Sequence, residues 1–222
     1  LESQTIRLPA ASSTENVVEE IKKLNQDDGV DGILLQHPVP AHIDESRCFN
    51  AIAENKDVDG VTFMSFARMA MNEMRFGSAT PLGIIRLLEA YKITIAGREA
   101  VVVGRSPIVG KPMALMLVNK DATVTICHSK TENLSAVVRR ADIVVGAVGR
   151  PKFIQADWIK DGAVVVDAGY NPGNVGDVDM DNLKDRVAAY TPVPGGVGPM
   201  TIATLFEQTV LAAELTHEIV QA

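Results

Sequence analysis

Four short and largely apolar runs stand out in the second half of the chain, at residues 100–103, 123–127, 143–147 and 164–167. Helical patterns follow the first two runs, at residues 112–118 and 134–140. Such runs are typical of strands in a parallel sheet that is covered on both faces, since neither face then needs polar side chains. The alternation therefore predicts an α/β fold with a Rossmann-like, doubly wound domain.

The first half of the chain shows a different pattern. Ser12 and Glu15 have capping-box spacing and precede an amphipathic helical segment that extends to Leu24. Residues 32–35 form a short apolar run, which we expect to be a strand, and prolines at 38 and 40 prevent its continuation. Gln36 is therefore expected at the carboxyl end of that strand.

Two more helix starts and one turn are indicated in the N-terminal half. Asp44 is expected to cap a helix that carries Cys48, Phe49 and Ile52. Thr80 is expected to cap the next helix, with proline at its first position. Residues 56–60, Lys-Asp-Val-Asp-Gly, are typical of a turn, and a long terminal helix is expected over residues 199–220.

Composition excludes several functional classes. The net charge of −7 and the pI near 5.1 argue against nucleic-acid binding. Cys48 and Cys127 lack the spacing of a zinc site or a disulfide framework, so we expect no metal and two reduced thiols in a cytoplasmic protein. The sequence has no apolar run of the roughly 18 residues that a membrane span requires, so we expect no membrane partner.

The segment from Gly104 to Lys111 is the strongest candidate for a binding loop. It lies between an expected strand and an expected helix, the arrangement that points unpaired backbone N–H groups at a phosphate. Its spelling, GRSPIVGK, is not the GxGxxG fingerprint, and the glycines by themselves are equally compatible with a simple chain reversal. The loop alone therefore leaves both interpretations open.

The end of the following strand favours a cofactor, and NADP in particular. An NAD-binding domain places an acidic residue there for the ribose hydroxyl, whereas this chain has His128, Ser129 and Lys130. Ser129, Lys130 and Arg105 could donate hydrogen bonds to the additional phosphate of NADP, which a carboxylate would repel. His128 alone is more typical of a structural residue than of a catalyst.

Six segments together resemble one enzyme family, in the expected order: DGILLQHPVP, KDVDG, ATPLGI, GRSPIVGKPM, CHSKT and PVPGGVGPMT. With these segments the chain is similar to bifunctional methylenetetrahydrofolate dehydrogenase/methenyltetrahydrofolate cyclohydrolase from about Leu8 to its C-terminus. The resemblance implies an α/β folate-substrate domain, residues 1–80 and 199–222, completed by the C-terminal helix. It also implies an inserted NADP domain, residues 81–198, with the cleft between the two domains and a homodimer in solution.

The resemblance also implies roles for individual residues. Gln36 would orient a catalytic lysine, and Asp59 would anchor the pterin ring. The folate site would be lined by Leu35, Gln36, His37, Asp59, Pro194, Gly195, Gly196, Val197 and Gly198, and the cofactor would be contacted at Gly104, Arg105, Ser106, Ser129 and Tyr170. Tyr170 stands where the family usually has isoleucine and uses backbone contacts.

The implied reaction has two steps on tetrahydrofolate derivatives. A hydride passes from the bridging methylene carbon to the nicotinamide, and water then opens the cationic methenyl group to a formyl group with the help of a general base. A carboxylate such as Asp59 suits the pterin because its two oxygens can accept paired N–H donors. Without the resemblance, Asp59 before Gly60 could equally be a turn residue, and Gln36 could be a structural hydrogen bonder.

The chain departs from the family pattern in one important respect. The family carries its lysine in a Tyr-x-x-x-Lys helix, and none of Tyr91, Tyr170 and Tyr190 has a lysine four residues later. Because Leu1 is not a natural start, we expect that an upstream segment has been omitted. The alternative is a noncatalytic NADP- or folate-binding module. His37, where the family often has leucine, is expected to be a tolerated polar residue.

Overall fold

The computed structural model describes residues 2–181 and 183–216. It divides into two compact units, Leu1–Gly77 with Leu205–Ala222, and Ser78–Thr204. No helix in the described part of the chain is long and apolar enough to cross a membrane.

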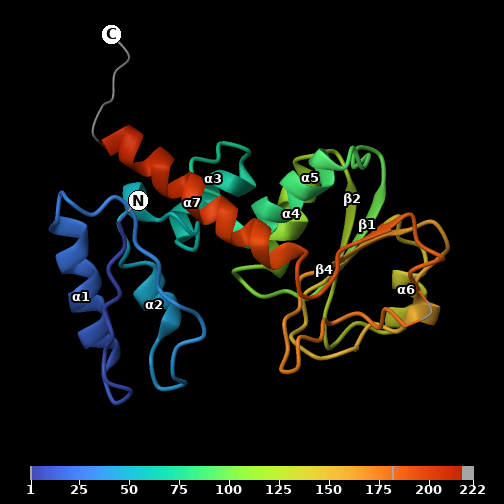
Figure 1. Ribbon diagram of the computed structural model, residues 1–222, viewed down its shortest axis with the longest axis horizontal. Coiled ribbons are helices and arrows are strands. Elements are labelled where there is room, and N and C mark those ends of the chain that lie inside the picture. The colour runs from blue at the N-terminus through green and yellow to red at the C-terminus, as the bar shows by residue number, and fades with distance from the viewer. Residues whose placement is uncertain (1, 182, 217–222) are drawn as a thin grey trace, which may run out of the picture. The chain divides into compact units, whose positions relative to one another are not determined.

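The second unit is built on a parallel sheet of five strands (Figure 1). The strands are β1 (Glu99–Val103), β2 (Thr123–Cys127), β3 (Ile143–Gly146), β4 (Val164–Asp167) and β5 (Ala189–Tyr190), in the order β2-β1-β3-β4-β5. All four pairings are parallel. The four strands predicted from apolar runs are confirmed, whereas β5 was missed because its two residues form no such run.

Helices cover both faces of this sheet, as a doubly wound fold requires (Figure 1). Helix α6 (Leu134–Val138) packs on the face that carries Val101 and Val103, together with the 3-10 helix η2 (Ala156–Trp158). Helices α4 (Ala79–Ala90) and α5 (Gly110–Val118) cover the other face. Successive residues of a strand point to opposite faces. Val102, between Val101 and Val103, is therefore buried on the face that α4 and α5 cover. The α/β fold class and its Rossmann-like domain are thus confirmed.

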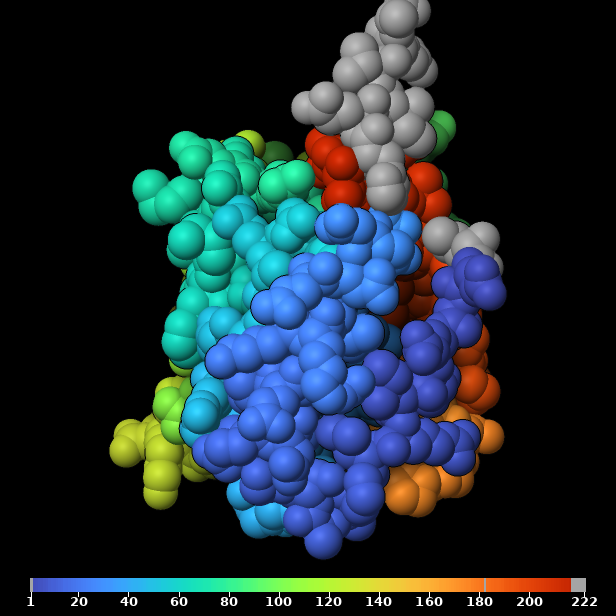
Figure 2. Space-filling model, turned by 90° about the vertical axis from the view of Figure 1, so that its left-hand side faces the viewer, coloured from blue at the N-terminus to red at the C-terminus, as the bar shows by residue number. Residues whose placement is uncertain are grey.

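The first unit is helical where the structure describes it. Its elements are α1 (Thr14–Gln26), α2 (Glu45–Phe49), the 3-10 helix η1 (Glu54–Lys56) and α3 (Phe63–Ala70), and it also receives the second part of α7 (Val197–Thr216). Helices α1 and α2 lie side by side on the face seen in Figure 2. They bury a small core that contains Val17, Val18, Ile21, Ile33, Cys48 and Ile52.

The strand predicted at residues 32–35 is wrong, since no strand is assigned there. Ile33 N–H donates to the carbonyl of Lys56 at 2.8 Å, but no ladder develops from this bond. The described part of the first unit offers no strand for residues 32–35 to pair with, and an apolar run forms a sheet only where a neighbour completes its hydrogen bonds. The expected α/β character of the substrate domain is therefore not seen in these residues.

Helix starts were predicted less accurately than helix positions. Helix α1 is capped by Ser13, which forms a capping box with Asn16, one residue later than the predicted pair. Glu15 instead pairs with Arg47 at 2.6 Å. Helix α4 begins at Ala79, before the predicted cap Thr80, and tolerates proline in its first turn because N–H groups there need no intrahelical partner.

The remaining helix predictions also changed in detail. Asp44 caps α2 as predicted, by accepting from Arg47 N–H, but the helix ends at Phe49 and Ile52 lies beyond it. Helix α7 begins at Val197, two residues before its predicted start. The last residues predicted for it, 217–220, lie outside the described residues.

Candidate cofactor and substrate sites

The strand order predicts a crevice outside the carboxyl ends of β1 and β3. The chain leaves β1 toward β2 on one side and later returns to β3 on the other, so these two strands form the topological switch point of the sheet. Ligands of open α/β sheets bind outside the carboxyl ends of strands at such a point. Gly104 follows β1 and Ala147 follows β3, and Ala147 N–H donates to the Val103 carbonyl at 2.8 Å.

Two glycines of the predicted phosphate loop are required by close backbone contacts. Gly104 has a φ of +136°, and a Cβ at this position would overlap the carbonyl oxygen of Ala147. A Cβ on Gly110 would overlap the carbonyl of Gly104. The glycines therefore bring the start of α5 directly against the end of β1.

Ser106 shapes this loop from within. Its Oγ accepts hydrogen bonds from the N–H groups of Val109 and Gly110, both at 3.2 Å. The Ser106 carbonyl accepts from Lys111 N–H at 3.0 Å. The predicted cofactor residue thus has a structural task, and its hydroxyl proton remains a potential donor to a phosphate. Arg105, beside it, is exposed.

The turn after β2 lies next to the Gly104 loop. Val103 and Cys127 are register partners, and Gly104 N–H donates to the Cys127 carbonyl at 2.9 Å. Within the turn, Lys130 N–H donates to Nδ1 of His128 at 3.1 Å, which supports the structural interpretation of His128. Ser129 and Lys130 are exposed at this edge, where a ligand could reach both.

The loop after β4 carries the last predicted cofactor residue. Tyr170 is 72% exposed, and its hydroxyl donates to Oδ1 of Asn174 at 2.6 Å. Gly104, Arg105, Ser106, Ser129 and Tyr170 therefore all follow the carboxyl ends of strands in one sheet. The structure places all of them at one edge of the sheet, and their contact with a cofactor stays a prediction.

Sequence reasoning missed two buried carboxylates at the same edge. Asp167, the last residue of β4, is 1% exposed, and Asp177, ten residues later, is fully buried. Burial raises the pKa of Asp167, while backbone N–H donors from Val178, Asp177 and Gly169 act in the opposite direction. The sequence did contain a signal for Asp167, because an aspartate at the end of an apolar strand is followed there by a turn rich in Gly and Asn.

The predicted folate residues of the first unit include Leu35, Gln36 and His37. Leu35 packs at the margin of the small core, and Gln36 is exposed with its Nε2 donating to the carbonyl of His37 at 3.0 Å. His37 Nδ1 shares a 2.6 Å hydrogen bond with Oε1 of Glu45, which also accepts from Val39 N–H at 3.2 Å. Glu45 therefore fixes the turn that presents Gln36.

The turn at residues 56–60 contains two aspartates that differ in burial. Asp57 is fully buried and accepts from Val61 N–H at 3.1 Å, from Thr62 N–H at 3.0 Å and from Ser65 Oγ at 2.6 Å. These bonds stabilise the turn and the start of α3. Asp59, two residues later, is only partly buried, and its role stays a prediction.

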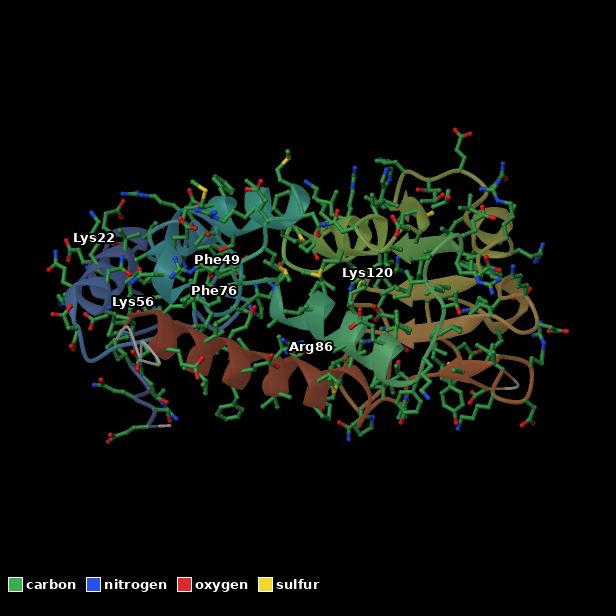
Figure 3. The ribbon with its side chains drawn as sticks, turned by 90° about the horizontal axis from the view of Figure 1, so that it is seen from above. Lys22, Phe49, Lys56, Phe76, Arg86 and Lys120 are labelled. Carbon is green, nitrogen blue, oxygen red and sulfur yellow. The ribbon has the colours of Figure 1, made fainter. Side chains whose placement is uncertain are left out.

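Lys56 has a structural role in the same turn. It is 4% exposed, and its Nζ donates to the carbonyls of Leu24 at 3.1 Å and Asp27 at 2.7 Å, at the end of α1. A cation at the carboxyl end of a helix satisfies its orphan carbonyls and interacts favourably with the helix dipole. Figure 3 labels Lys56 together with Lys22, which is exposed on α1.

The predicted folate segment from Pro194 to Gly198 belongs to the second unit. Gly195 has a φ of +99°, and a Cβ on Gly196 would meet the Pro192 carbonyl and the side chain of Thr191. Val197 is 6% exposed and begins α7. Gly198 has open space around it, so the segment offers exposed backbone at Pro194, Gly195 and Gly198.

Both parts of the chain match domains of one enzyme family. Residues 1–59 match the catalytic domain of tetrahydrofolate dehydrogenase/cyclohydrolase, and residues 78–217 match its NAD(P)-binding domain. The chain belongs to the tetrahydrofolate dehydrogenase/cyclohydrolase family. The predicted domain boundaries, after residues 80 and 198, differ slightly from those of the compact units and remain predictions.

Relatives in this family are close in sequence. The bifunctional protein FolD of Cellvibrio japonicus is 64% identical over 214 residues, which cover 96% of this chain and 76% of the relative. FolD of Marinomonas sp. is 62% identical over 209 residues, covering 94% of this chain and 75% of the relative.

Solved structures of the family share the fold. The 5,10-methylenetetrahydrofolate dehydrogenase of the silkworm Bombyx mori gives a TM-score of 0.90 at 42% identity, covering 94% of this chain and 76% of that one. The Trypanosoma brucei dehydrogenase-cyclohydrolase, solved with NADP cofactor and inhibitor, gives 0.89 at 35% identity, covering 97% and 76%.

Among residues 2–181 and 183–216, no group of three or more His, Cys, Asp or Glu side chains is arranged to hold a metal ion.

Proposed function

We propose that this chain oxidises methylenetetrahydrofolate to methenyltetrahydrofolate with NADP and hydrolyses the product to formyltetrahydrofolate. The observation that carries the proposal is the glycine-lined crevice at the switch point of the sheet, in a chain whose two parts match the two domains of the family. Relatives at 62–64% identity are named bifunctional protein FolD. These names do not favour the alternative of a noncatalytic binding module.

The residues present suit a dinucleotide with an additional phosphate. The N-terminus of α5 favours a phosphate. Gly104 lets the loop lie directly against the Ala147 carbonyl, where a side chain at position 104 would not fit. We propose that Gly104, Arg105, Ser106, Ser129 and Tyr170 hold NADP, which when bound supplies the hydride acceptor. Arg105 and Ser129, both exposed, would meet the 2′-phosphate.

The folate residues would bind and orient the substrate. We propose that the carboxylate of Asp59, which is only partly buried, accepts N–H donors from the pterin. Gln36, held through the turn that Glu45 fixes, would orient the lysine that the family uses as general base. Leu35, His37 and Pro194 to Gly198 would line the site. Water attack on the methenyl carbon then needs that base within hydrogen-bond reach.

An absorbance assay on the natural full-length chain tests the proposed function. We expect methenyltetrahydrofolate to form from methylenetetrahydrofolate only when NADP is present, and then to disappear as the ring is hydrolysed. Absence of NADP-dependent methenyl formation would reject the dehydrogenase. Formation without accelerated decay would reject the second activity alone, because the two signals are recorded separately.

Arg105→Ala is expected to weaken NADP binding by about tenfold or more and to change NAD binding much less. The guanidinium can form a charge-assisted pair with the 2′-phosphate, a contact typically worth about 1.5–3 kcal/mol, and NAD lacks this phosphate. Titration calorimetry with both cofactors measures the two dissociation constants. Lys120→Ala is the control. Lys120 is an exposed cation in the same unit, lies just after the carboxyl end of α5 and pairs with Glu89 (Figure 3). Equal losses for NAD and NADP would contradict the assignment of Arg105.

Three further properties belong to the same proposal. We propose a homodimer that is located in the cytoplasm and does not bind nucleic acid, the last because the net charge is −7. Analytical ultracentrifugation of the full-length chain tests the dimer, and a single species at the monomer mass would contradict it.

A further inference from the structure

A fully buried carboxylate holds the loop that forms one wall of the cofactor crevice. Asp177 Oδ2 accepts from the N–H groups of Val148 at 2.6 Å and Gly149 at 2.8 Å, and its Oδ1 accepts from Arg150 N–H at 2.9 Å. Asn171 Nδ2 donates to the same Oδ1 at 3.0 Å. Four donors therefore converge on one side chain that has no contact with solvent.

Asp167 holds Asp177 in turn. Its carboxylate accepts from the backbone N–H groups of Gly169, Asp177 and Val178, each at 2.9 Å. A Cβ on Gly169 would overlap the carboxylate of Asp177, and a Cβ on Gly176 would overlap that of Asp167. The loop after β4 is thus folded tightly around both carboxylates. Through these hydrogen bonds, the end of β4 fixes where the loop after β3 lies.

The loop held by Asp177 adjoins the crevice. It begins at Ala147, whose carbonyl oxygen is the nearest atom to the position of a Cβ on Gly104. Displacement of residues 148–150 would carry Ala147 with it and change the width of the crevice beside the phosphate loop. Because the side chain of Asp177 is fully buried, it acts on the crevice through this backbone and not by touching a ligand.

Three consecutive N–H groups that point at one acceptor form a nest of the kind that binds anions. In this chain the nest at residues 148–150 is filled by the carboxylate of Asp177. A cofactor phosphate can therefore bind at the start of α5, but the nest at residues 148–150 is not available to it. The internal carboxylate both shapes the wall of the crevice and removes a competing phosphate site from it.

We infer that Asp177 is a positioning residue for NADP, which fixes the wall formed by Ala147 to Arg150. This inference rests on the proposed binding of NADP at the switch point. Asp177 is not among the residues predicted to contact the cofactor. Its role would be to keep residues 147–150 in the position that NADP binding requires.

Asp177→Asn in the full-length chain tests the inference. Asparagine has nearly the same size but replaces one accepting oxygen with an NH₂ group, which would face N–H donors instead of accepting from them. We expect the dissociation constant and the KM for NADP to rise about tenfold or more, while the KM for the folate substrate changes little. Amide hydrogen exchange at residues 148–150 should become faster in the variant without cofactor.

Asp179→Asn is the matched control, since Asp179 lies two residues away and pairs at the surface with Lys152. If Asp177→Asn does not fold, Asn171→Ala replaces it, because this change removes one donor to Asp177 and leaves the carboxylate in place. We expect Asn171→Ala to weaken NADP binding by a smaller factor, about threefold.

The outcomes separate the inference from the proposed function. A wild-type chain that does not bind NADP would remove the proposed function itself. A wild-type chain that binds NADP, together with a folded Asp177→Asn variant of unchanged affinity, would overturn the positioning role. Lower thermal stability with an unchanged dissociation constant would overturn it equally, since it would show a purely structural carboxylate.

Discussion

Gly104→Ala is expected to abolish measurable NADP binding and to lower the free energy of unfolding by about 3 kcal/mol or more. Two causes act together. The φ of +136° lies in a region that side chains rarely adopt, and the new Cβ would overlap the carbonyl oxygen of Ala147. Because the obstructing atom is backbone, relief requires that β1 and β3 separate at the crevice.

Urea unfolding and cofactor titration measure the two effects of Gly104→Ala. Gly162→Ala is the control, since Gly162 has a φ of +77° in the same unit but nothing within 4 Å of a Cβ at this position. The backbone strain alone should cost about 1 kcal/mol and leave NADP affinity unchanged. If both variants lose the same stability and both still bind NADP, close packing at Gly104 has no role in cofactor binding.

Asp57→Ala is expected to destabilise the protein by about 3 kcal/mol or more, because three donors would lose their acceptor and two of them are backbone N–H groups. Asp57 is fully buried, and Val61, Thr62 and Ser65 all donate to its carboxylate. Thermal and urea unfolding of the variant measure the loss. A change of less than about 1 kcal/mol would contradict the structural role assigned to Asp57.

Asp59→Ala, two residues away, is the matched comparison and should have the opposite profile. Loss of two charge-assisted hydrogen bonds to the pterin predicts a fall in kcat/KM for methylenetetrahydrofolate of about 100-fold or more. NADP affinity should not change, and the loss of stability should be smaller than for Asp57→Ala. If Asp59→Ala retains full activity, the pterin contact proposed for it is wrong.

The fold of the second unit was predictable because its signals are local. The runs at β2 and β4 gave their bounds correctly. In β4, Val165 and Val166 are buried, as expected for a strand that is covered on both faces. The edge strand β2 alternates Thr with Val and Ile and remains partly exposed. Strand β5 has only two residues. It forms because the N–H groups of Ala188 and Thr191 donate to the carbonyls of Ala163 and Val165, beside and within β4. Residues 32–35 illustrate the opposite case, in which an apolar run lacks a neighbouring strand.

The candidate site was predictable only in part, for a similar reason. The Gly104 loop is a continuous segment between a strand and a helix, so the sequence shows all of its parts together. Asp177 serves N–H groups that lie 27 to 29 residues earlier in the chain, and no local pattern reveals such a partnership. The roles of Asp57 and Asp59 could not be distinguished either, because the sequence does not show which of two neighbouring carboxylates turns inward.

The two glycines that adjoin the buried carboxylates also constrain how this loop can change during evolution. Gly169 lies against Asp177, and Gly176 lies against Asp167, so neither glycine can gain a side chain while its opposing carboxylate is present. A single substitution at any of the four positions leaves either a steric overlap or unpaired donors. Divergence here requires coupled changes, and a lineage can reach a different loop only by replacing a glycine together with the carboxylate that faces it.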